Sequence, residues 1–307
     1  MSLHFKKRHT AIFAFLLAIA LVFACDARAQ DRADCRAMRS TVLHSAVRFC
    51  VFLPASYSDP GAKTRKYPVL YLLHGLGGTN QSMAVDGEWT ELQDLRHENK
   101  VGDFIVVSPE GWDTFYINSR DGQTPYSDFF LNEFMPYVER IYRVQGTRVA
   151  RGITGFSMGG YGAFRFAFLH PELFGSVSAH SAAIVRDPPN QVNGVQSPGN
   201  FVSEVLGKTF GDPVDRQYWF QNSPFVLARK KAEELKRTKI YFDCGTEDTY
   251  GLNVGAAELH ETLDALKIPH EFHLYPGGHG TSYLVAHRSA SFEFHWRVFH
   301  PAAQGAN

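Results

Sequence analysis

The chain has 307 residues and is 44% hydrophobic, which suits one large domain with a sizeable core. Its 31 basic and 31 acidic residues give no net charge, and no basic stripe interleaved with aromatic residues occurs, so we expect no nucleic-acid partner. No C-x-x-C motif is present, and we expect neither a metal ion nor a cofactor.

The first 29 residues have the pattern of an export signal. A basic stretch at 6–8 precedes an apolar run at 11–24, and Ala27-Arg28-Ala29 forms a small-residue cleavage signal. The apolar run is shorter than the roughly 20 residues of a membrane span. We therefore expect cleavage after Ala29 and export to the periplasm or medium, with no stable membrane span afterwards. A lipoprotein anchored through Cys25 is the alternative.

Cleavage would leave three cysteines. In an oxidising compartment Cys35 and Cys50 could pair across an N-terminal hairpin. Cys244 ends an apolar strand and is expected to be a buried thiol.

The N-terminal part predicts a sheet edge followed by buried strands. Residues 30–40 are polar and expected to be loose, whereas 41–44 and 47–53 are predicted to pair antiparallel at the edge of a sheet. The apolar runs at 68–73 and 104–107 are typical of strands buried on both faces. Helices are expected at 88–99 and at 129–141, the second capped by Ser127 or Asp128.

The remainder alternates between strands and helices. This alternation predicts one α/β domain over 30–307, with a mainly parallel sheet, helices on both faces and an antiparallel N-terminal edge. The segment 181–224 is rich in Pro, Gly, Asn and Gln and is predicted to be an insertion or cap over the carboxyl edge of the sheet. The expected strands are 149–154, 174–179, 239–243 and 270–275, and the expected helices are 161–169, 224–236, 254–266 and 282–299.

The segment Gly155-Phe156-Ser157-Met158-Gly159 matches G-x-S-x-G, with a strand expected before it and a helix after it. That context is the nucleophile elbow, a tight strand-to-helix turn that exposes a serine hydroxyl. Glycine is needed at 155 and 159 because the turn brings backbone segments together. Ser157 is therefore the candidate nucleophile.

A serine hydroxyl needs a base, and the base needs an orienting acid, in the chain order serine, acid, histidine. His279 follows the last strand in a glycine-rich loop and is the preferred base. Asp248 is the preferred acid, with Glu247 and Asp243 as alternatives. The other late histidines are expected to be structural or on the surface: His270, His273, His287, His295 and His300.

The tetrahedral intermediate of acyl transfer carries a negative oxygen that needs hydrogen-bond donors. The amide of Met158, directly after the serine, is one expected donor. The loop His74-Gly75-Leu76 after a buried strand should supply the other, which we assign to the Leu76 amide. Trp112, Tyr116 and Tyr126 follow another strand end and are candidates for an acyl or aromatic pocket.

Four segments together resemble the esterase-D/antigen-85 family of serine esterases, which includes feruloyl, acetyl-xylan and tributyrin-type esterases. The resemblance implies an α/β-hydrolase fold, a triad on Ser157, Asp248 and His279, and an oxyanion hole at Leu76 and Met158. Residues 181–224 contain no motif of the family. The matching segments are HGLGG at 74–78, GFSMGG at 155–160, CGTED at 244–248 and PGGH at 276–279.

These observations predict a secreted serine carboxylesterase acting on a small-molecule or polysaccharide-linked ester through an acyl-enzyme. An acyltransferase of the antigen-85 type remains open, because it would share the acyl-enzyme and differ only in the acceptor. A non-catalytic protein that binds carbohydrate or cell wall on the same scaffold is the third reading.

Overall fold

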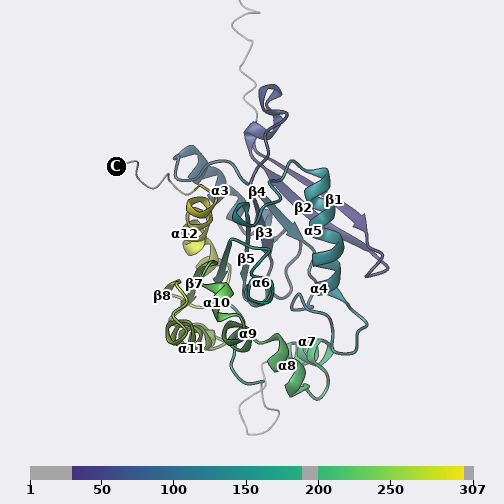
Figure 1. Cartoon of the computed structure of the whole chain (residues 1–307), viewed down its shortest axis with the longest axis vertical. Helices are drawn as coiled ribbons and strands as arrows, with labels where there is room; N and C mark the ends of the chain where they lie inside the picture. Colours follow the sequence, from purple (N-terminus) through teal and green to yellow (C-terminus); the bar gives the residue numbers. More distant parts are fainter. Residues whose placement is uncertain (1–29, 189–199, 301–307) are drawn as a thin grey trace, which may run out of the picture.

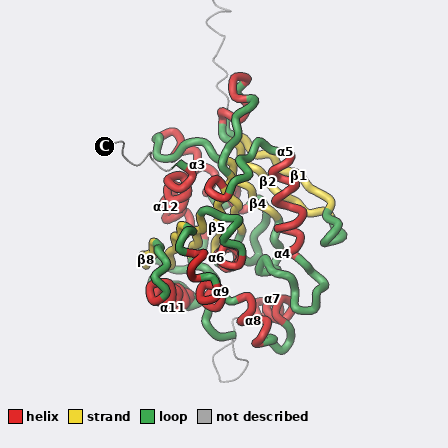
Figure 2. Tube along the Cα trace, viewed as in Figure 1, coloured by secondary structure: helices red, strands yellow, loops and turns green. Residues whose placement is uncertain are grey.

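The computed structural model describes residues 30–188 and 200–300. The predicted signal segment with Cys25, and part of the predicted cap, therefore lie outside the described residues. Figures 1 and 2 show a central sheet with helices packed around it.

Among the described residues the sheet has eight strands, in the order β1-β2-β4-β3-β5-β6-β7-β8. β2 pairs antiparallel with both β1 and β4, whereas the strands from β4 to β8 pair parallel. The mainly parallel sheet with an antiparallel N-terminal edge is thus confirmed. The strands are β1 Arg32–Arg39, β2 Ala46–Leu53, β3 Val69–Leu73, β4 Ile105–Pro109, β5 Arg151–Phe156, β6 Ser176–His180, β7 Lys239–Gly245 and β8 Glu271–Tyr275.

Helices cover both faces of the sheet because successive strand residues point to opposite sides. Leu70 and Leu72 of β3 pack in a core shared with α3 and α12. Val69 and Tyr71 face the larger core, shared with α4, α5, α6 and α11. The helices are α2 Ser82–Val85, α3 Glu88–His97, α4 Tyr126–Phe129, α5 Met135–Ile141, α6 Met158–Leu169, α7 Asn200–Phe210, α8 Arg216–Asn222, α9 Pro224–Lys230, α10 Ala232–Leu235, α11 Leu252–Ala265 and α12 Thr281–Phe299. Short 3-10 turns lie at Ala55–Ser58, Pro60–Ala62 and Arg148–Ala150.

The first strand is not where the sequence predicted it. β1 occupies most of the segment expected to be loose, and residues 41–45 form the bend that leads into β2. Cys35 lies opposite Cys50 in the β1–β2 register, and the two form a disulfide. Within β1 only Met38 is buried, so the strand lacks the apolar alternation on which a strand prediction depends.

The helix expected at 129–141 begins earlier and is not uniform. α4 starts at Tyr126, a π-helical segment at Phe130–Phe134 follows, and α5 completes it. Pro125 occupies the N-cap position, so neither Ser127 nor Asp128 caps the helix. The Ser127 hydroxyl instead accepts a hydrogen bond from the buried guanidinium of Arg165 at 2.7 Å.

The described part of 181–224 packs over the loop that follows β4. The Tyr218 hydroxyl on α8 donates to the Asn118 carbonyl at 2.6 Å. The Tyr161 hydroxyl, one turn into α6, donates to the Asn222 carbonyl at 3.0 Å. Both anchors lie near the carboxyl ends of the strands, which supports our proposal that this segment is a cap.

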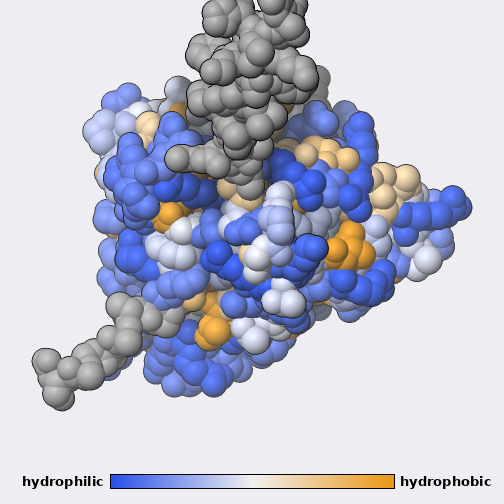
Figure 3. Space-filling view, turned by 90° about the horizontal axis from the view of Figure 1, so that it is seen from above, coloured by the Kyte–Doolittle hydropathy of each residue, from blue (hydrophilic) through white to orange (hydrophobic). Residues whose placement is uncertain are grey.

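On the face in Figure 3, hydrophilic residues predominate and hydrophobic ones form small separate patches. Within residues 30–188 and 200–300, no helix is both long and apolar enough to span a bilayer.

Candidate active site

β5 and α6 meet in a tight turn at Ser157. This residue has φ 54° and ψ −116°, a backbone conformation that is costly for any residue except glycine. Its amide donates to the His180 carbonyl at 3.0 Å, and its carbonyl accepts from the amides of Tyr161 and Ala183. These bonds hold the strained residue in place, with strand before it and helix after it.

The two glycines of the motif are needed because backbone segments touch there. A Cβ on Gly155 would lie 2.2 Å from the carbonyl carbon of Gly159, and a Cβ on Gly159 would lie 2.0 Å from the Leu73 carbonyl oxygen. The second contact joins the start of α6 to the end of β3. The loop at 74–78 therefore leaves β3 directly beside Ser157.

The structure brings Ser157, His279 and Asp248 together from three separate loops. His279 lies between β8 and α12, and its Nε2 is 3.1 Å from the Ser157 hydroxyl oxygen. Its Nδ1 is 2.8 Å from Oδ2 of Asp248, which lies between β7 and α11. The serine faces one ring nitrogen and the carboxylate the other, which is the arrangement that general-base activation requires.

Asp248 is held as a carboxylate although its side chain is buried. Burial alone would raise its pKa, but hydrogen bonds from His279 and from the Tyr250 and Leu252 amides outweigh burial and lower the pKa below the usual value. The two amides lie 2.9 and 3.4 Å from Oδ1. This leaves Oδ2 for the imidazole and fixes the carboxylate plane.

The other two candidate acids lie elsewhere. Asp243 is buried and its carboxylate contacts His180, Tyr241 and Tyr283. Glu247 is exposed at the surface of the same loop. Of the three, Asp248 is the one that contacts His279.

Sequence reasoning did not identify the side chains that pack around this group. The Cys244 thiol donates to Asp248 Oδ2 at 3.5 Å, and burial raises the pKa of that thiol to about 12, so it stays a neutral donor. The rings of Phe156 and Tyr250 each have centroids 4.8 Å from that of His279. Cys244 and Phe156 lie inside the motif segments and Tyr250 lies two residues beyond one, but only the folded loops show the contacts.

The two amides proposed to bind the oxyanion have no hydrogen-bond acceptor among the described residues. Met158 is the first residue of α6, where an amide has no acceptor within the helix. No acceptor for the Leu76 or Met158 amide is found in the part of the chain that the structure describes. The Leu76 loop is tied down by His74, whose Nε2 accepts from the Gly111 amide at 2.9 Å while its Nδ1 contacts the Gly75 carbonyl at 2.8 Å.

A pocket of about 380 Å³ opens beside this loop. It is bounded by Leu76 and Phe156 on the side of the elbow, by Ser82 and Asp86 around α2, and by Leu284 of α12. Its lining mixes apolar and polar residues and includes Leu76, one of the two proposed oxyanion donors, but not Ser157, Met158 or His279.

Tyr116 and Tyr126, predicted to contact substrate, are fully buried. Their hydroxyls donate to the carbonyls of His74 and Glu110, so both act in this structure as supports of the loops. Trp112 is 38% exposed and packs edge-on against Tyr126, so the proposal of an aromatic substrate contact rests on Trp112.

The sheet, the elbow and the loops at the carboxyl ends of the strands define an α/β-hydrolase. A family model described as a putative esterase matches residues 40–290, and the chain belongs to this family.

Two curated relatives and two solved structures are similar to this chain. Esterase Rv1288 of Mycobacterium tuberculosis (strain ATCC 25618 / H37Rv) is 31% identical over 251 residues, which are 75% of this chain and 51% of that protein, so the chain spans about half its length. The acetyl esterase of Caldicellulosiruptor saccharolyticus is 26% identical over 183 residues, which are 58% of this chain and 65% of that one. A ferulic acid esterase structure has a TM-score of 0.74 at 29% identity and covers 88% of this chain and 99% of its own. The S-formylglutathione hydrolase of Staphylococcus aureus has a TM-score of 0.69 at 23% identity, covers 87% of this chain and 99% of its own, and supports the fold alone.

Proposed function

We propose that the chain is an exported serine carboxylesterase. The hydrogen-bonded series Ser157–His279–Asp248 at a nucleophile elbow carries the proposal. Membership in a putative esterase family, with relatives named acetyl esterase and ferulic acid esterase, supports it.

In the proposed reaction the Ser157 hydroxyl attacks the ester carbonyl while His279 Nε2 takes its proton. Asp248 keeps the His279 proton on Nδ1 and stabilises the imidazolium that forms. The Leu76 and Met158 amides donate to the oxyanion of the tetrahedral intermediate. His279 then protonates the leaving alcohol, and a water activated by the same nitrogen releases the acid from the acyl-enzyme.

The proposal of export rests on the predicted signal, which lies outside the described residues, and gains support from the disulfide between Cys35 and Cys50. Disulfides persist in oxidising compartments and are rare in the cytosol.

The test compares the wild type with Ser157→Ala on p-nitrophenyl acetate, butyrate and feruloyl esters and with a fluorophosphonate probe. We expect the variant to lose about 10⁴-fold or more in kcat and all labelling. Ser45→Ala, which changes an exposed serine at the β1–β2 bend, is the control and should keep both.

Full activity of Ser157→Ala would end the assignment. Absence of labelling in the wild type would favour the non-catalytic reading. Adding glycerol and analysing the products separates hydrolysis from transfer, because an acyltransferase would form the glycerol ester in preference to the free acid.

A further inference from the structure

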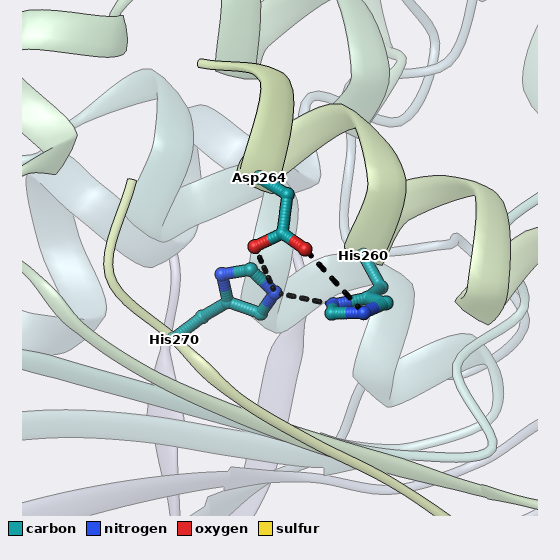
Figure 4. A group of neighbouring side chains, drawn as sticks. All are labelled: His260, Asp264 and His270. Carbon is teal, nitrogen blue, oxygen red and sulfur yellow. Dashed lines mark hydrogen bonds and ion pairs between the residues drawn. The ribbon is translucent and has the colours of Figure 1, made fainter. Parts of the chain in front are cut away.

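Three metal-ligating side chains meet where α11 turns into β8. Figure 4 shows His260 and Asp264 on α11 and His270 on the segment that follows, all pointing toward one another. α11 rises about 1.5 Å per residue, so Asp264 lies about 18 Å along the helix from Leu252, the residue whose amide supports Asp248. The cluster is therefore separate from the candidate active site.

The local fold brings these residues together. His260 and Asp264 are four apart on one helix and share a face. The helix ends in a turn in which Lys267 has φ 56° and the Ile268 amide donates to the Leu263 carbonyl at 2.9 Å. Ile268 is buried, which fixes the turn and returns His270 to the same face.

Both rings are held by aromatic neighbours. His270 stacks on Phe242 of β7 with centroids 5.8 Å apart, and only 3% of its side chain is exposed. His260 stacks on Phe272 of β8 with centroids 4.7 Å apart. The buried His270 ring is a pre-organised ligand, since it has little rotamer freedom left to lose on binding.

The hydrogen bonds fix where the lone pairs point. His270 Nδ1 lies 2.8 Å from the Ile268 carbonyl, so this nitrogen carries the proton and Nε2 is an acceptor. His260 Nδ1 lies 2.7 Å from that Nε2 and donates to it. In the neutral ring the lone pair of His260 Nε2 then faces the Asp264 carboxylate at 3.5 Å. A metal ion between the rings would take the place of the His260 Nδ1 proton, which can move to Nε2 and face Asp264, leaving His260 Nδ1 and His270 Nε2 as ligands.

We propose that His260, Asp264 and His270 bind a divalent transition-metal ion such as Zn²⁺, Co²⁺ or Ni²⁺. One nitrogen from each imidazole and one carboxylate oxygen, all within 4.8 Å of one another, are a set that these ions prefer over Mg²⁺ or Ca²⁺. His270 makes the bond from its other nitrogen to a backbone carbonyl that typically orients metal-bound histidines.

Binding a single ion requires the side chains of the cluster to adjust. Ligands of a tetrahedral zinc at about 2.0–2.1 Å lie roughly 3.3 Å apart, so the two imidazoles must separate by about half an ångström. His260 and Asp264 have side chains 38% and 64% exposed and can move while the buried His270 stays. The same exposure lets the ion enter and lets water complete the coordination shell. The bound ion would link the end of α11 to the start of the edge strand β8.

The test uses the mature chain without a histidine tag, stripped with a chelator and titrated with Zn²⁺ by calorimetry. We expect one equivalent bound at this site and a rise in Tm on the order of 5 °C at saturating Zn²⁺. His260→Gln and Asp264→Asn should each weaken that binding at least tenfold. Co²⁺ absorption in the visible range provides a second readout that reports the coordination directly.

Glu261→Gln removes an exposed carboxylate from the same helix without touching the cluster and is the matched control, expected to bind as the wild type does. Ester hydrolysis by apo His260→Gln and Asp264→Asn should equal that of the wild type. Equal Zn²⁺ affinity in the control and in both cluster variants, or no saturable binding by the wild type, would overturn the proposal. His260, Asp264 and His270 would then have only a structural role at the end of α11.

Discussion

Asp248 combines a negative charge with nearly complete burial, and burial of a carboxylate is costly unless its oxygens are paired. Here Oδ1 accepts from two backbone amides and Oδ2 contacts His279 and the Cys244 thiol. All of these partners are donors, so the site stabilises the ionised form. The residue is therefore suited to orient an imidazole rather than to exchange protons itself.

Replacing Asp248 by Asn should lower kcat by about 10³–10⁴-fold with little change in KM. The amide has one acceptor oxygen, so it cannot satisfy both the backbone donors and the His279 Nδ1–H, and the wrong imidazole tautomer is favoured. Initial rates on p-nitrophenyl acetate measure the effect, with exposed Glu247→Gln as the control. Near-normal rates for Asp248→Asn would move the acid role to Glu247 or Asp243.

Gly159→Ala should unfold or strongly destabilise the chain, by about 2–4 kcal/mol, because the added Cβ meets the backbone oxygen of Leu73 rather than a movable side chain. Gly207→Ala is the matched control. Gly207 lies on α7, and an added Cβ there would be 3.4 Å from its nearest neighbour, the Cβ of Asp212. Alanine is also more favourable than glycine in a helix by up to about 1 kcal/mol. Urea unfolding of both variants should show opposite shifts in midpoint. A midpoint for Gly159→Ala equal to that of the wild type would show that the turn can relax.

At the scale of elements, the attachment of β1 to the sheet depends more on the Cys35–Cys50 disulfide than on burial of its side chains. Seven of its eight residues are at least partly exposed, and it pairs with a single neighbour, β2. An edge strand with so little apolar burial gains little from the hydrophobic effect. The strand is attached by its backbone hydrogen bonds to β2, by the disulfide to Cys50 and by contacts of Asp34 and Arg36 with Tyr142.

Loss of the disulfide should lower the free energy of unfolding by about 3 kcal/mol, the value expected for a closed loop of roughly 15 residues. The Cys35→Ala/Cys50→Ala variant and the reduced wild type should unfold at similar, lower Tm values, and amide exchange should be fastest in β1. Adding reductant to the double variant is the control and should change nothing. An oxidised wild type no more stable than the double variant would contradict the role of the link.

Short sequence motifs identified the loops that the structure brings together around Ser157, but no motif identified this edge strand. The elbow and the His279 loop carry fixed short patterns, because a strained turn and a close backbone approach allow few residues. β1 has no such constraint, so its exposed residues resemble a loop. Tyr126 begins a helix without a capping side chain, and that start gives no signal in the sequence.

The cluster at His260, Asp264 and His270 lay beyond sequence reasoning for a related reason. The expectation of no metal came from the absence of a cysteine motif, which carries no information on pairs of histidines. The partner of His270 is instead on α11, across a turn whose path depends on the burial of Ile268. A pairing between a helix and the segment beyond it depends on tertiary structure.

At the scale of the whole molecule, α12 closes the face of the sheet opposite α6 and brings polar groups into the core. Arg288 forms a fully buried ion pair with Glu88 of α3. His295 lies between the hydroxyls of Ser176 and Ser178 on β6, with ring nitrogens 2.7 and 2.9 Å from the two oxygens. A buried polar layer of this kind is stable only while every member keeps its charge state.

Stability should therefore fall as the pH drops below about 6.5. Burial, followed by the nearby charge of Arg288, holds the pKa of His295 well below its usual value, and burial also lowers the pKa of His180. Both rings are neutral when folded but bind a proton when unfolded. Their contribution is thus fully present above the unfolded value of about 6.5 and is lost as the pH falls toward the folded values.

Each histidine should contribute a slope of up to about 1.4 kcal/mol per pH unit in that window. Urea unfolding at pH 7.5, 6.5 and 5.5 measures the slope for the wild type and for His295→Gln, whose amide can still bond to the serine hydroxyls without titrating. The variant should lose about half of the combined slope, whereas exposed His97→Gln on α3 should keep all of it. An unchanged slope in His295→Gln would contradict the prediction, because it would mean that this ring binds a proton as readily in the folded state as in the unfolded state.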